Sequence, residues 1–283
     1  MRHLTLTQNL LGRPLALSGE RVAVIRQLLA QGADDIGLFG RTLNAGFWQD
    51  DTDSRPVSQL SDIVAGVGII RVSGVLMPGC GGSPWWDWIT LYGDIDAAMR
   101  EAMGNEDVKA IALHIDSPGG TVAGCFDTAD RIYAARGTKP IVAIVDEAAY
   151  SAAYAIASAA DRIILPRTGG VGSIGVVGMH VDITGMLDQA GIKVTTFQFG
   201  DQKTDSYPTT PMTDGAASRF QADIDEMGEL FVATVARNRG LSPDAVRATQ
   251  AATFLGQHGV AAGLADAVMS ADNAMMDVIA SLG

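Results

Sequence analysis

The chain has 283 residues, a length that suits one large domain or two ordinary ones. Hydrophobic residues make up 47% of it and charged residues 18%, so a sizeable core can form and global disorder is excluded. The 32 acidic residues against 20 basic ones give a net charge of −12, which is unfavourable for binding nucleic acid or an anionic membrane surface.

The N-terminal part differs in composition from the rest. Apolar residues at helical spacing predict a helix over Glu20–Gln31, and the polar, acidic stretch 49–62 is typical of a linker. We therefore expect a helical appendage and linker over 1–62 and the main domain over 63–283. No apolar run reaches the roughly 20 residues that span a bilayer, and no secretory leader is evident, so the sequence predicts a soluble cytoplasmic protein without a membrane anchor.

From residue 66 onwards, short apolar runs rich in β-branched residues alternate with helical patterns. The predicted strands are Val67–Val72, Ala110–Ile115, Ile141–Val145, Ile163–Leu165, Gly175–Val181 and Val194–Phe199. The predicted helices are Asp94–Met103, Val122–Arg136, Ser151–Ala159, Thr184–Gln189, Ala216–Arg239, Ser242–Ala248 and Asn273–Ala280. Strands followed by amphipathic helices favour parallel pairing, so we expect an α/β domain with a helical C-terminal region.

The two cysteines and the tryptophans carry weaker signals. Cys80 and Cys125 have neither metal-ligand spacing nor a pattern of disulfides, so we interpret both as structural and predict no metal site. Trp85, Trp86 and Trp88 fall in a segment rich in glycine and proline. They either bind a peptide or a neighbouring subunit, or pack back onto the core of the domain, and the sequence does not separate these hypotheses.

A glycine-containing turn, HIDSPGGTVAG (114–124), follows one predicted strand and precedes a helix. In a parallel sheet, ligands bind beyond the carboxyl ends of the strands. Gly119 and Gly120 would allow backbone N–H groups to approach a ligand closely. Alone this signal is weak, because many α/β turns need glycine.

Ser151 occupies the same edge of the predicted sheet. It lies where the strand Ile141–Val145 leads into a helix of small residues, which would place its hydroxyl beside the N–H of Ala152. A nucleophile next to an oxyanion donor is one interpretation. A simple helix N-cap is the other, and it is the commoner role for a serine at this position.

A serine nucleophile needs a base, and the histidines offer one candidate. His3 lies in the appendage, His114 inside an apolar strand and His258 in a late helical segment. His180 ends a predicted strand, so a serine–histidine–acid arrangement with Ser151 stays open.

The lysines divide by strand polarity. Lys109, Lys139 and Lys193 precede predicted strands and would lie at the edge of the sheet remote from Ser151. Lys203 follows the predicted strand Val194–Phe199, so it alone would lie at the same edge as Ser151. It could act as a base if desolvation kept it neutral; otherwise it is an ordinary loop lysine. Asp205 either orients a partner or is a turn residue.

Six segments together resemble one family. They are GIIRVSGVL (68–76), IALHIDSPGGTVAG (111–124), AAYSAAYAIASAADRIILP (148–166), GGVGSIGVVGMHVD (169–182), GIKVTTFQFGDQKTD (191–205) and FLGQHGVAAGLAD (254–266). In this order they resemble the signal peptide peptidase A (protease IV) family of Clp-like serine peptidases, and within it the prohead proteases of tailed phages. The ordered set is far more specific than any one member.

The resemblance implies a serine endopeptidase with Ser151 as nucleophile and Lys203 as general base, and no metal or cofactor. It implies an oxyanion hole from Gly119 or Gly120 with the amide of Ala152. It further implies a Clp/crotonase-like spiral core, and a homo-oligomeric ring in which neighbouring subunits sometimes supply the serine and the lysine of one site. The expected partners are polypeptides: scaffold, portal or capsid proteins of a phage head, and the chain's own termini.

Two departures and two further alternatives stand beside this expectation. Tyr150 precedes the serine where a small residue is common and would narrow the pocket, and Ser206 and Tyr207 replace the expected Gly-Asn. A crotonase-type acyl-CoA enzyme would instead need carboxylates such as Asp116 or Glu147 near the glycine turn. A catalytically inert ring that binds scaffold through the tryptophans is the non-enzymatic alternative.

Overall fold

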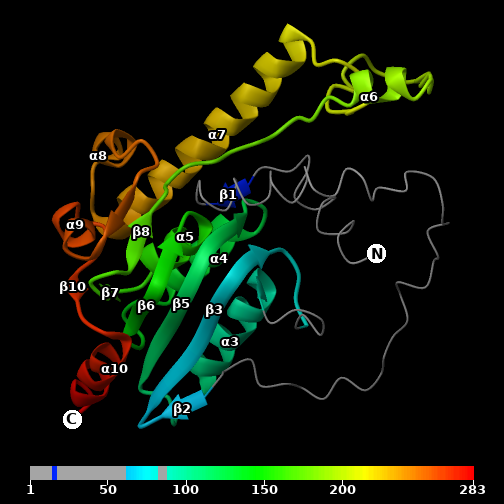
Figure 1. Cartoon of the computed structure of the whole chain (residues 1–283). Helices are drawn as coiled ribbons and strands as arrows, with labels where there is room; N and C mark the ends of the chain where they lie inside the picture. Colours follow the sequence, from blue (N-terminus) through cyan, green and yellow to red (C-terminus); the bar gives the residue numbers. More distant parts are fainter. Residues whose placement is uncertain (1–14, 18–61, 82–87) are drawn as a thin grey trace.

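The computed structural model describes residues 15–17, 62–81 and 88–283. A mostly parallel sheet runs through the body, with helices on both of its faces (Figure 1). Its central strands lie in the order β10-β7-β6-β5-β3-β2, and only β2 in this row is antiparallel to its neighbour. The expected α/β class with parallel pairing is confirmed.

The strands of the central row are β2 (Asp62–Val64), β3 (Val67–Met77), β5 (Ala110–Thr121), β6 (Ile141–Tyr150), β7 (Arg162–Leu165) and β10 (Ala267–Val268). Four short strands extend it: β1 (Leu15–Leu17), β4 (Ile89–Leu91), β8 (Gly170–Gly172) and β9 (Thr253–Leu255). Of these, β4 runs parallel to β3 and β8 parallel to β6, whereas β1 is antiparallel to β5 and β9 to β8.

The helices are α3 (Tyr92–Gly104), α4 (Cys125–Ala134), α5 (Ala152–Ser158), α6 (Thr184–Gln189), α7 (Asp214–Arg239), α8 (Pro243–Ala248), α9 (Gly256–Ala261) and α10 (Ala271–Ala280). Alternation along β5 separates two cores. Ile111, Leu113 and Ile115 face the larger core, under α3, α4, α5 and α7, while Ala110 and Ala112 face a smaller one beneath α10. The central strands are therefore covered on both sides, which explains their nearly continuous apolar sequences.

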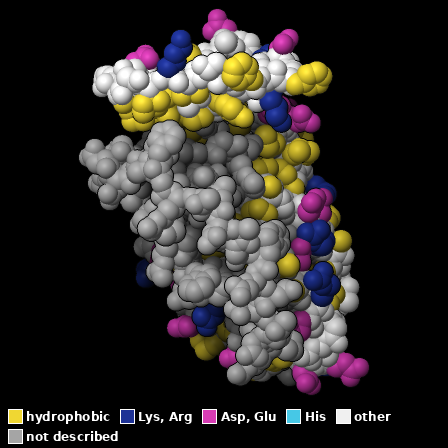
Figure 2. All heavy atoms as spheres, turned by 90° about the vertical axis from the view of Figure 1, so that its right-hand side faces the viewer, with side chains coloured by type: hydrophobic (Ala, Val, Ile, Leu, Met, Phe, Trp, Pro, Cys, Tyr) yellow, Lys and Arg dark blue, Asp and Glu magenta, His cyan; other side chains and the backbone are white. Residues whose placement is uncertain are grey.

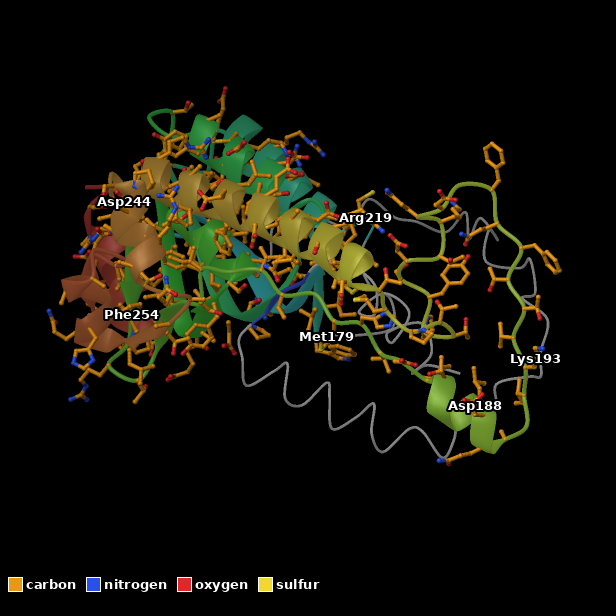
Figure 3. The ribbon with its side chains drawn as sticks, turned by 90° about the horizontal axis from the view of Figure 1, so that it is seen from above. Met179, Asp188, Lys193, Arg219, Asp244 and Phe254 are labelled. Carbon is orange, nitrogen blue, oxygen red and sulfur yellow. The ribbon has the colours of Figure 1, made fainter. Side chains whose placement is uncertain are left out.

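One segment leaves this body. Residues 175–213, which we call the arm, run outwards from β8, carry α6 and return to the start of α7 (Figures 1 and 3). Several of its large apolar side chains are exposed: Val181, Met186, Ile192, Val194, Phe197, Phe199 and Tyr207. Phe197 and Phe199 are almost completely exposed, at 93% and 101%.

The arm contains the two clear errors in the predicted elements. Neither Gly175–Val181 nor Val194–Phe199 becomes a strand. Both have the apolar, β-branched composition of a strand, but in the arm neither has an adjacent strand of the described chain to form a ladder with. Val177 alone forms an isolated bridge, so composition predicted ladders that the described part of the chain does not supply.

Other differences concern length and position. Strands β5 and β6 continue to Thr121 and Tyr150, so the glycine turn and the residues before Ser151 are strand ends rather than loops. The short β2, β4, β8, β9 and β10 and helix α9 were not predicted, because two to six residues carry too little periodicity. The predicted helix Glu20–Gln31, most of the linker, Trp85 and Trp86 lie outside the described residues.

Polar side chains hold the larger core together at the end of α5. The guanidinium of Arg136 donates hydrogen bonds to the carbonyls of Ser158, Ala159 and Ala160, where α5 ends. The buried amide of Asn238, in α7, donates to the Ser158 hydroxyl at 3.0 Å. These bonds supply partners to carbonyls that the helix cannot satisfy itself, and they fix α5 between α4 and α7.

A second group of polar interactions joins α7 to the sheet and predicts that the fold loses stability at acidic pH. Arg239 pairs with Asp266 at 2.7 Å, and Asp266 also accepts the N–H of Ile163 in β7. Burial opposes ionisation of Asp266, but the hydrogen bonds from Arg239 and Ile163 outweigh it and lower its pKa. A lowered folded-state pKa contributes stability that is present above the unfolded pKa and lost as pH falls through the folded one.

We therefore expect Asp266→Asn to lower the free energy of unfolding by about 1–2 kcal/mol at pH 7. The difference between the variant and the wild type should shrink progressively as the pH falls below 4, as measured by urea unfolding at several pH values. Asp244→Asn is the matched control, since Asp244 pairs with Arg247 but its side chain is 95% exposed. It should change stability by less than about 0.5 kcal/mol. A difference between Asp266→Asn and wild type that does not vary with pH would contradict the assignment.

Candidate active site

Ser151 forms a sharp turn between β6 and α5. Its backbone has φ 55° and ψ −121°, a conformation that is rare for any residue other than glycine. The Ser151 N–H donates to the Gly172 carbonyl of β8 at 2.8 Å, and the Ser151 carbonyl accepts the Ala155 N–H at 3.0 Å. A strained strand-to-helix turn of this kind is how hydrolases present a nucleophilic serine.

The Ser151 hydroxyl is buried and has no hydrogen-bond partner in the part of the chain that the structure describes. Ser151 occupies the N-cap position of α5, but its hydroxyl makes no capping hydrogen bond, so capping does not explain this side chain. A buried hydroxyl without a partner costs stability. Neither the strained backbone of Ser151 nor its unpartnered hydroxyl stabilises the described part of the fold. Both features therefore favour a functional role for Ser151.

The glycine turn lies next to this serine, at the carboxyl end of β5. Ser117 in β5 is paired with Ala149 in β6, two residues before Ser151. The Ser117 hydroxyl donates to the Gly74 carbonyl at 2.6 Å and accepts the Gly119 N–H at 3.1 Å. The structure therefore brings the glycine turn and Ser151 to the same edge of the sheet, as expected, although the Gly119 N–H already has an acceptor.

Ala152 is the first residue of α5, and its amide precedes the first intrahelical hydrogen bond, which begins at Ala155. The Ala152 carbonyl accepts a long hydrogen bond of 3.7 Å from the thiol of Cys125, at the start of α4. Complete burial raises the pKa of Cys125 to about 12, so this thiol stays protonated at neutral pH. Cys80, by contrast, is exposed.

The residues predicted to bind substrate are only partly described. Tyr150 is half-buried and packs against β8, because a Cβ on Gly170 would lie 2.0 Å from the Tyr150 hydroxyl oxygen. Trp88 is 45% exposed, and its carbonyl accepts the Val75 N–H of β3 at 2.8 Å.

Lys203 lies in the arm, where its side chain is exposed. It is not hydrogen-bonded to the Ser151 hydroxyl, which has no partner. The argument from strand polarity fails here, because Val194–Phe199 is not a strand. The same argument holds for Lys109 and Lys139, which precede β5 and β6, and it fails for Lys193 in the arm.

The other candidate bases do not contact Ser151 either. His180, at the base of the arm, has a buried Nε2 without a partner among the described residues. His114 is half-buried in β5, His258 is exposed in α9, and His3 lies outside the described residues. Asp205 forms an ion pair with Arg219 of α7 at 2.5 Å, which attaches the arm to that helix. Within the described chain, Ser151 therefore has no base.

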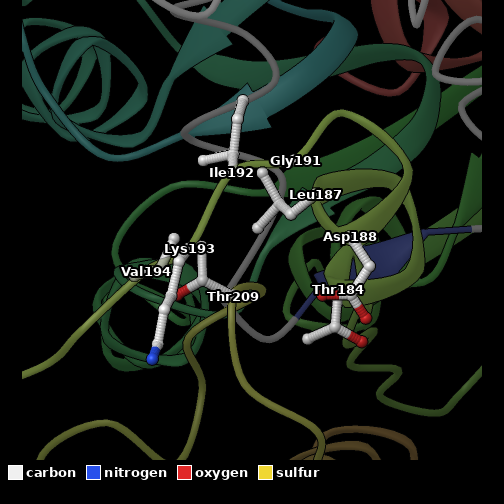
Figure 4. Close-up of a pocket in the computed structure, with 8 residues that line it drawn as sticks. All are labelled: Thr184, Leu187, Asp188, Gly191, Ile192, Lys193, Val194 and Thr209. Carbon is white, nitrogen blue, oxygen red and sulfur yellow. The ribbon is translucent and has the colours of Figure 1, made fainter.

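A pocket of about 360 Å³ lies in the arm, away from Ser151. It is lined by Thr184, Leu187, Asp188, Gly191, Ile192, Lys193, Val194 and Thr209 (Figure 4). From above, Asp188 and Lys193 lie at the outer end of the arm, whereas Phe254, which pairs with Val171 of β8, lies at the opposite side of the molecule (Figure 3).

The carboxylates required by an acyl-CoA enzyme are exposed rather than enclosed. Asp116 and Glu147 both lie on the surface, and Glu147 accepts the Thr168 hydroxyl at 3.1 Å. Neither shares a hydrogen bond with the glycine turn. This arrangement gives the crotonase-type alternative no support.

The unpartnered hydroxyl predicts that replacing Ser151 stabilises the fold. Ser151→Ala removes a buried polar group without a partner and should raise the free energy of unfolding by about 1 kcal/mol. Ser151→Gly also relieves the positive φ, so it should keep most of this gain despite the entropy of glycine. Chemical denaturation of both variants checks this, and a loss of more than about 1 kcal/mol in Ser151→Ala would show that the hydroxyl is satisfied in solution.

The close approach of β3 to the glycine turn gives a second prediction. A Cβ on Gly120 would lie 1.9 Å from the Leu76 carbonyl oxygen, so Gly120→Ala should destabilise the fold by about 1–3 kcal/mol. Gly228→Ala in α7 is the control: no atom lies within 4 Å of its added Cβ, and it should stabilise by about 0.5–1 kcal/mol. Thermal unfolding of both variants tests the contrast, and equal effects would contradict it.

The sequence also matches known proteins. Residues 133–281 match the profile of Peptidase family S49. The chain is 39% identical over 213 residues to the Head-tail preconnector protein GP5 of Enterobacteria phage P21, covering 75% of this chain and 42% of that protein. It is 32% identical over 225 residues to the Capsid assembly protease C of Escherichia phage lambda, covering 80% and 51%.

A cellular protein matches at lower identity. The Probable protease SohB of Haemophilus influenzae is 26% identical over 200 residues, which cover 70% of this chain and 55% of that protein. The chain thus spans about half the length of these relatives. In the part of the chain that the structure describes, none of the helices combines the length and hydrophobicity that a membrane span requires. The match over more than half of the sequence, which includes Ser151 and α5, shows that the chain belongs to Peptidase family S49.

Proposed function

We propose that this protein is a serine endopeptidase in which Ser151 is the nucleophile and Lys203 the general base. The observation that carries the proposal is the Ser151 hydroxyl, buried at a strained turn without a hydrogen-bond partner among the described residues. Membership of a peptidase family and the phage proteins among the relatives support it. A Clp/crotonase-like core is part of the same proposal.

In the proposed reaction, the Ser151 Oγ attacks the carbonyl carbon of a peptide bond while neutral Lys203 accepts the hydroxyl proton. The oxyanion is stabilised by the amides of Ala152 and of Gly119 or Gly120. The Lys203 ammonium then gives its proton to the leaving amine, and an acyl ester on Ser151 remains. Water, deprotonated by Lys203, hydrolyses this ester and restores the serine.

This mechanism requires a neutral lysine at the site. An ordinary lysine is protonated at neutral pH, and desolvation of the amine favours its neutral form. Lys203 is exposed in the isolated chain, whereas Ser151 is fully buried. Moving the Lys203 amine to the Ser151 turn would desolvate it, so activation of the base and assembly of the site would be one event.

We further propose that Lys203 reaches Ser151 of a neighbouring subunit in a homo-oligomeric ring. The arm supports this idea because it extends away from the body and exposes Phe197, Phe199 and other apolar side chains. Hydrophobic side chains gather along the arm at the top of Figure 2. An exposed apolar surface of this kind is typical of a contact between protein subunits.

The names of the phage relatives, a capsid assembly protease and a head-tail preconnector protein, favour polypeptides of a phage head as substrates. Scaffold, portal or capsid proteins, cleaved in the host cytoplasm or in the virion precursor, are the substrates we propose. The small residues around Ser151 favour small or aliphatic side chains before the cleaved bond.

The catalytic assignment is tested with head proteins and a serine-directed phosphonate. We expect the phosphonate to label Ser151 and abolish cleavage, and Ser151→Ala and Lys203→Met each to lower kcat by at least about 1,000-fold. His180→Ala, the control for the alternative triad, should keep activity within about threefold. Cleavage that depends on His180 and survives in Lys203→Met would overturn the choice of base. No labelling and no cleavage of any head protein, with assembly retained, would favour an inert scaffold-binding ring.

Mixing the two inactive variants tests the shared site. If each site combines Ser151 of one subunit with Lys203 of another, co-assembled Ser151→Ala and Lys203→Met chains will regenerate intact sites. About a quarter of the wild-type activity should return when subunits mix at random. If both residues come from one chain, no mixture will recover activity. Measuring cleavage after joint refolding at a 1:1 ratio distinguishes the two outcomes.

A further inference from the structure

A short N-terminal strand pairs with the glycine turn. Strand β1 (Leu15–Leu17) runs antiparallel to the carboxyl end of β5, with Leu15 opposite Thr121, Ala16 opposite Gly120 and Leu17 opposite Gly119. In Figure 1 this strand lies near the upper ends of the central strands. It therefore contacts the two glycines assigned above to the candidate oxyanion hole.

The ladder partners of β5 show which edge β1 occupies. On one side, β3 stays paired with β5 from Val67 opposite Ala110 to Leu76 opposite Gly120. On the other side, β6 is paired with β5 as far as Ser117 opposite Ala149 and then turns at Ser151. A strand has two hydrogen-bonding edges, so β1 must lie on the edge that β6 leaves, next to the Ser151 turn.

We propose that this edge, Gly119–Thr121, binds an extended polypeptide segment as an added antiparallel strand, and that Leu15–Leu17 is an internal occupant that competes with substrate. The inference rests on the proposed function. Addition of a peptide to a free strand edge is a general mode of recognition, in which main-chain hydrogen bonds supply the affinity. It presents a peptide backbone directly beside the candidate nucleophile and the oxyanion donors.

The occupant is suited to displacement. Three paired residues form too small a ladder to be stable alone, so its occupancy depends on the covalent connection through residues 18–61. Any such covalent connection raises the local concentration of β1 at this edge far above that of a dilute free peptide. A substrate held in an assembly can reach a local concentration high enough to compete with β1 for the edge, whereas a dilute protein cannot. The strand therefore favours substrates that are present at high local concentration.

A binding experiment in the full chain tests the inference without relying on catalysis. In a Ser151→Ala background, Leu15, Ala16 and Leu17 are all changed to proline, which removes every N–H donor of β1. The control changes Leu4, Thr5 and Leu6, a triplet of similar composition, to proline. A fluorescent peptide with the sequence of residues 10–22 is titrated against each protein and followed by anisotropy.

We expect the peptide to bind the variant with prolines at 15–17 at least tenfold more tightly than either the parent or the control, because its internal competitor is absent. The same peptide with N-methyl groups on the amides of Leu15, Ala16 and Leu17 should lose this binding, since its donors are blocked. Equal affinity for all three proteins, or unchanged binding of the methylated peptide, would overturn the proposal.

Amide hydrogen exchange adds a measurement that an altered global stability would not mimic. Exchange at Gly120 and Thr121 should accelerate at least tenfold in the variant with prolines at 15–17, with no change in the β3–β5 ladder near Ala112. Unchanged exchange at both amides would show that β1 does not occupy the edge. These results are independent of the phosphonate test. If Ser151 does not react with the phosphonate, the proposed peptidase activity is refuted while peptide binding at this edge can still be observed. If Ser151 reacts but the peptide does not bind, the proposal about β1 is refuted while the peptidase activity stands.

Discussion

The hydrogen bond from the Ser151 N–H to the Gly172 carbonyl is the interaction on which the candidate site depends. It fixes a serine at φ 55°, where the backbone is strained, at the point where β6 ends. The acceptor belongs to β8, which is paired with β9, and the Ser173 N–H donates to the Ala252 carbonyl. Residues about 100 positions later in the sequence thus hold the turn in place, and the strain is supported by a sheet rather than by a loop.

This arrangement positions the buried hydroxyl of Ser151, the proposed nucleophile, but supplies no base beside it within the described chain. All seven residues of α5 are buried, and they are small except for Tyr154 and Ile156, so α5 can pack tightly against the sheet behind the turn. The exposed residues that could complete the site lie instead in the arm, together with apolar side chains that a soluble monomer would not ordinarily expose. The arm carries both the proposed base, Lys203, and an exposed apolar surface, and the two have a common explanation if the arm docks onto another copy.

The sequence was sufficient to predict the body of the fold and the position of Ser151, because continuous apolar strands and small-residue helices leave clear patterns. It was not sufficient for the arm. Val194–Phe199 has the composition of a buried strand. Apolar composition indicates that these side chains pack against something, but it does not indicate whether the partner belongs to the same chain or to another one. The choice of Lys203 by strand polarity therefore began from a wrong strand, and what supports Lys203 is the match of its segment to the family. Strand β1 could not be predicted, since Leu15–Leu17 is too short to show a period.

Under the two proposals, activity depends on two separate encounters. The lysine must arrive from a neighbouring arm, and the internal strand must leave the Gly119–Thr121 edge. Each requirement depends on concentration: subunit association grows with the amount of this protein, and displacement of β1 grows with the local amount of substrate. In a dilute solution both equilibria favour the inactive arrangement, and within a crowded assembly both reverse. A peptidase built in this way would need no separate inhibitor, because the geometry of its own chain links cleavage to assembly.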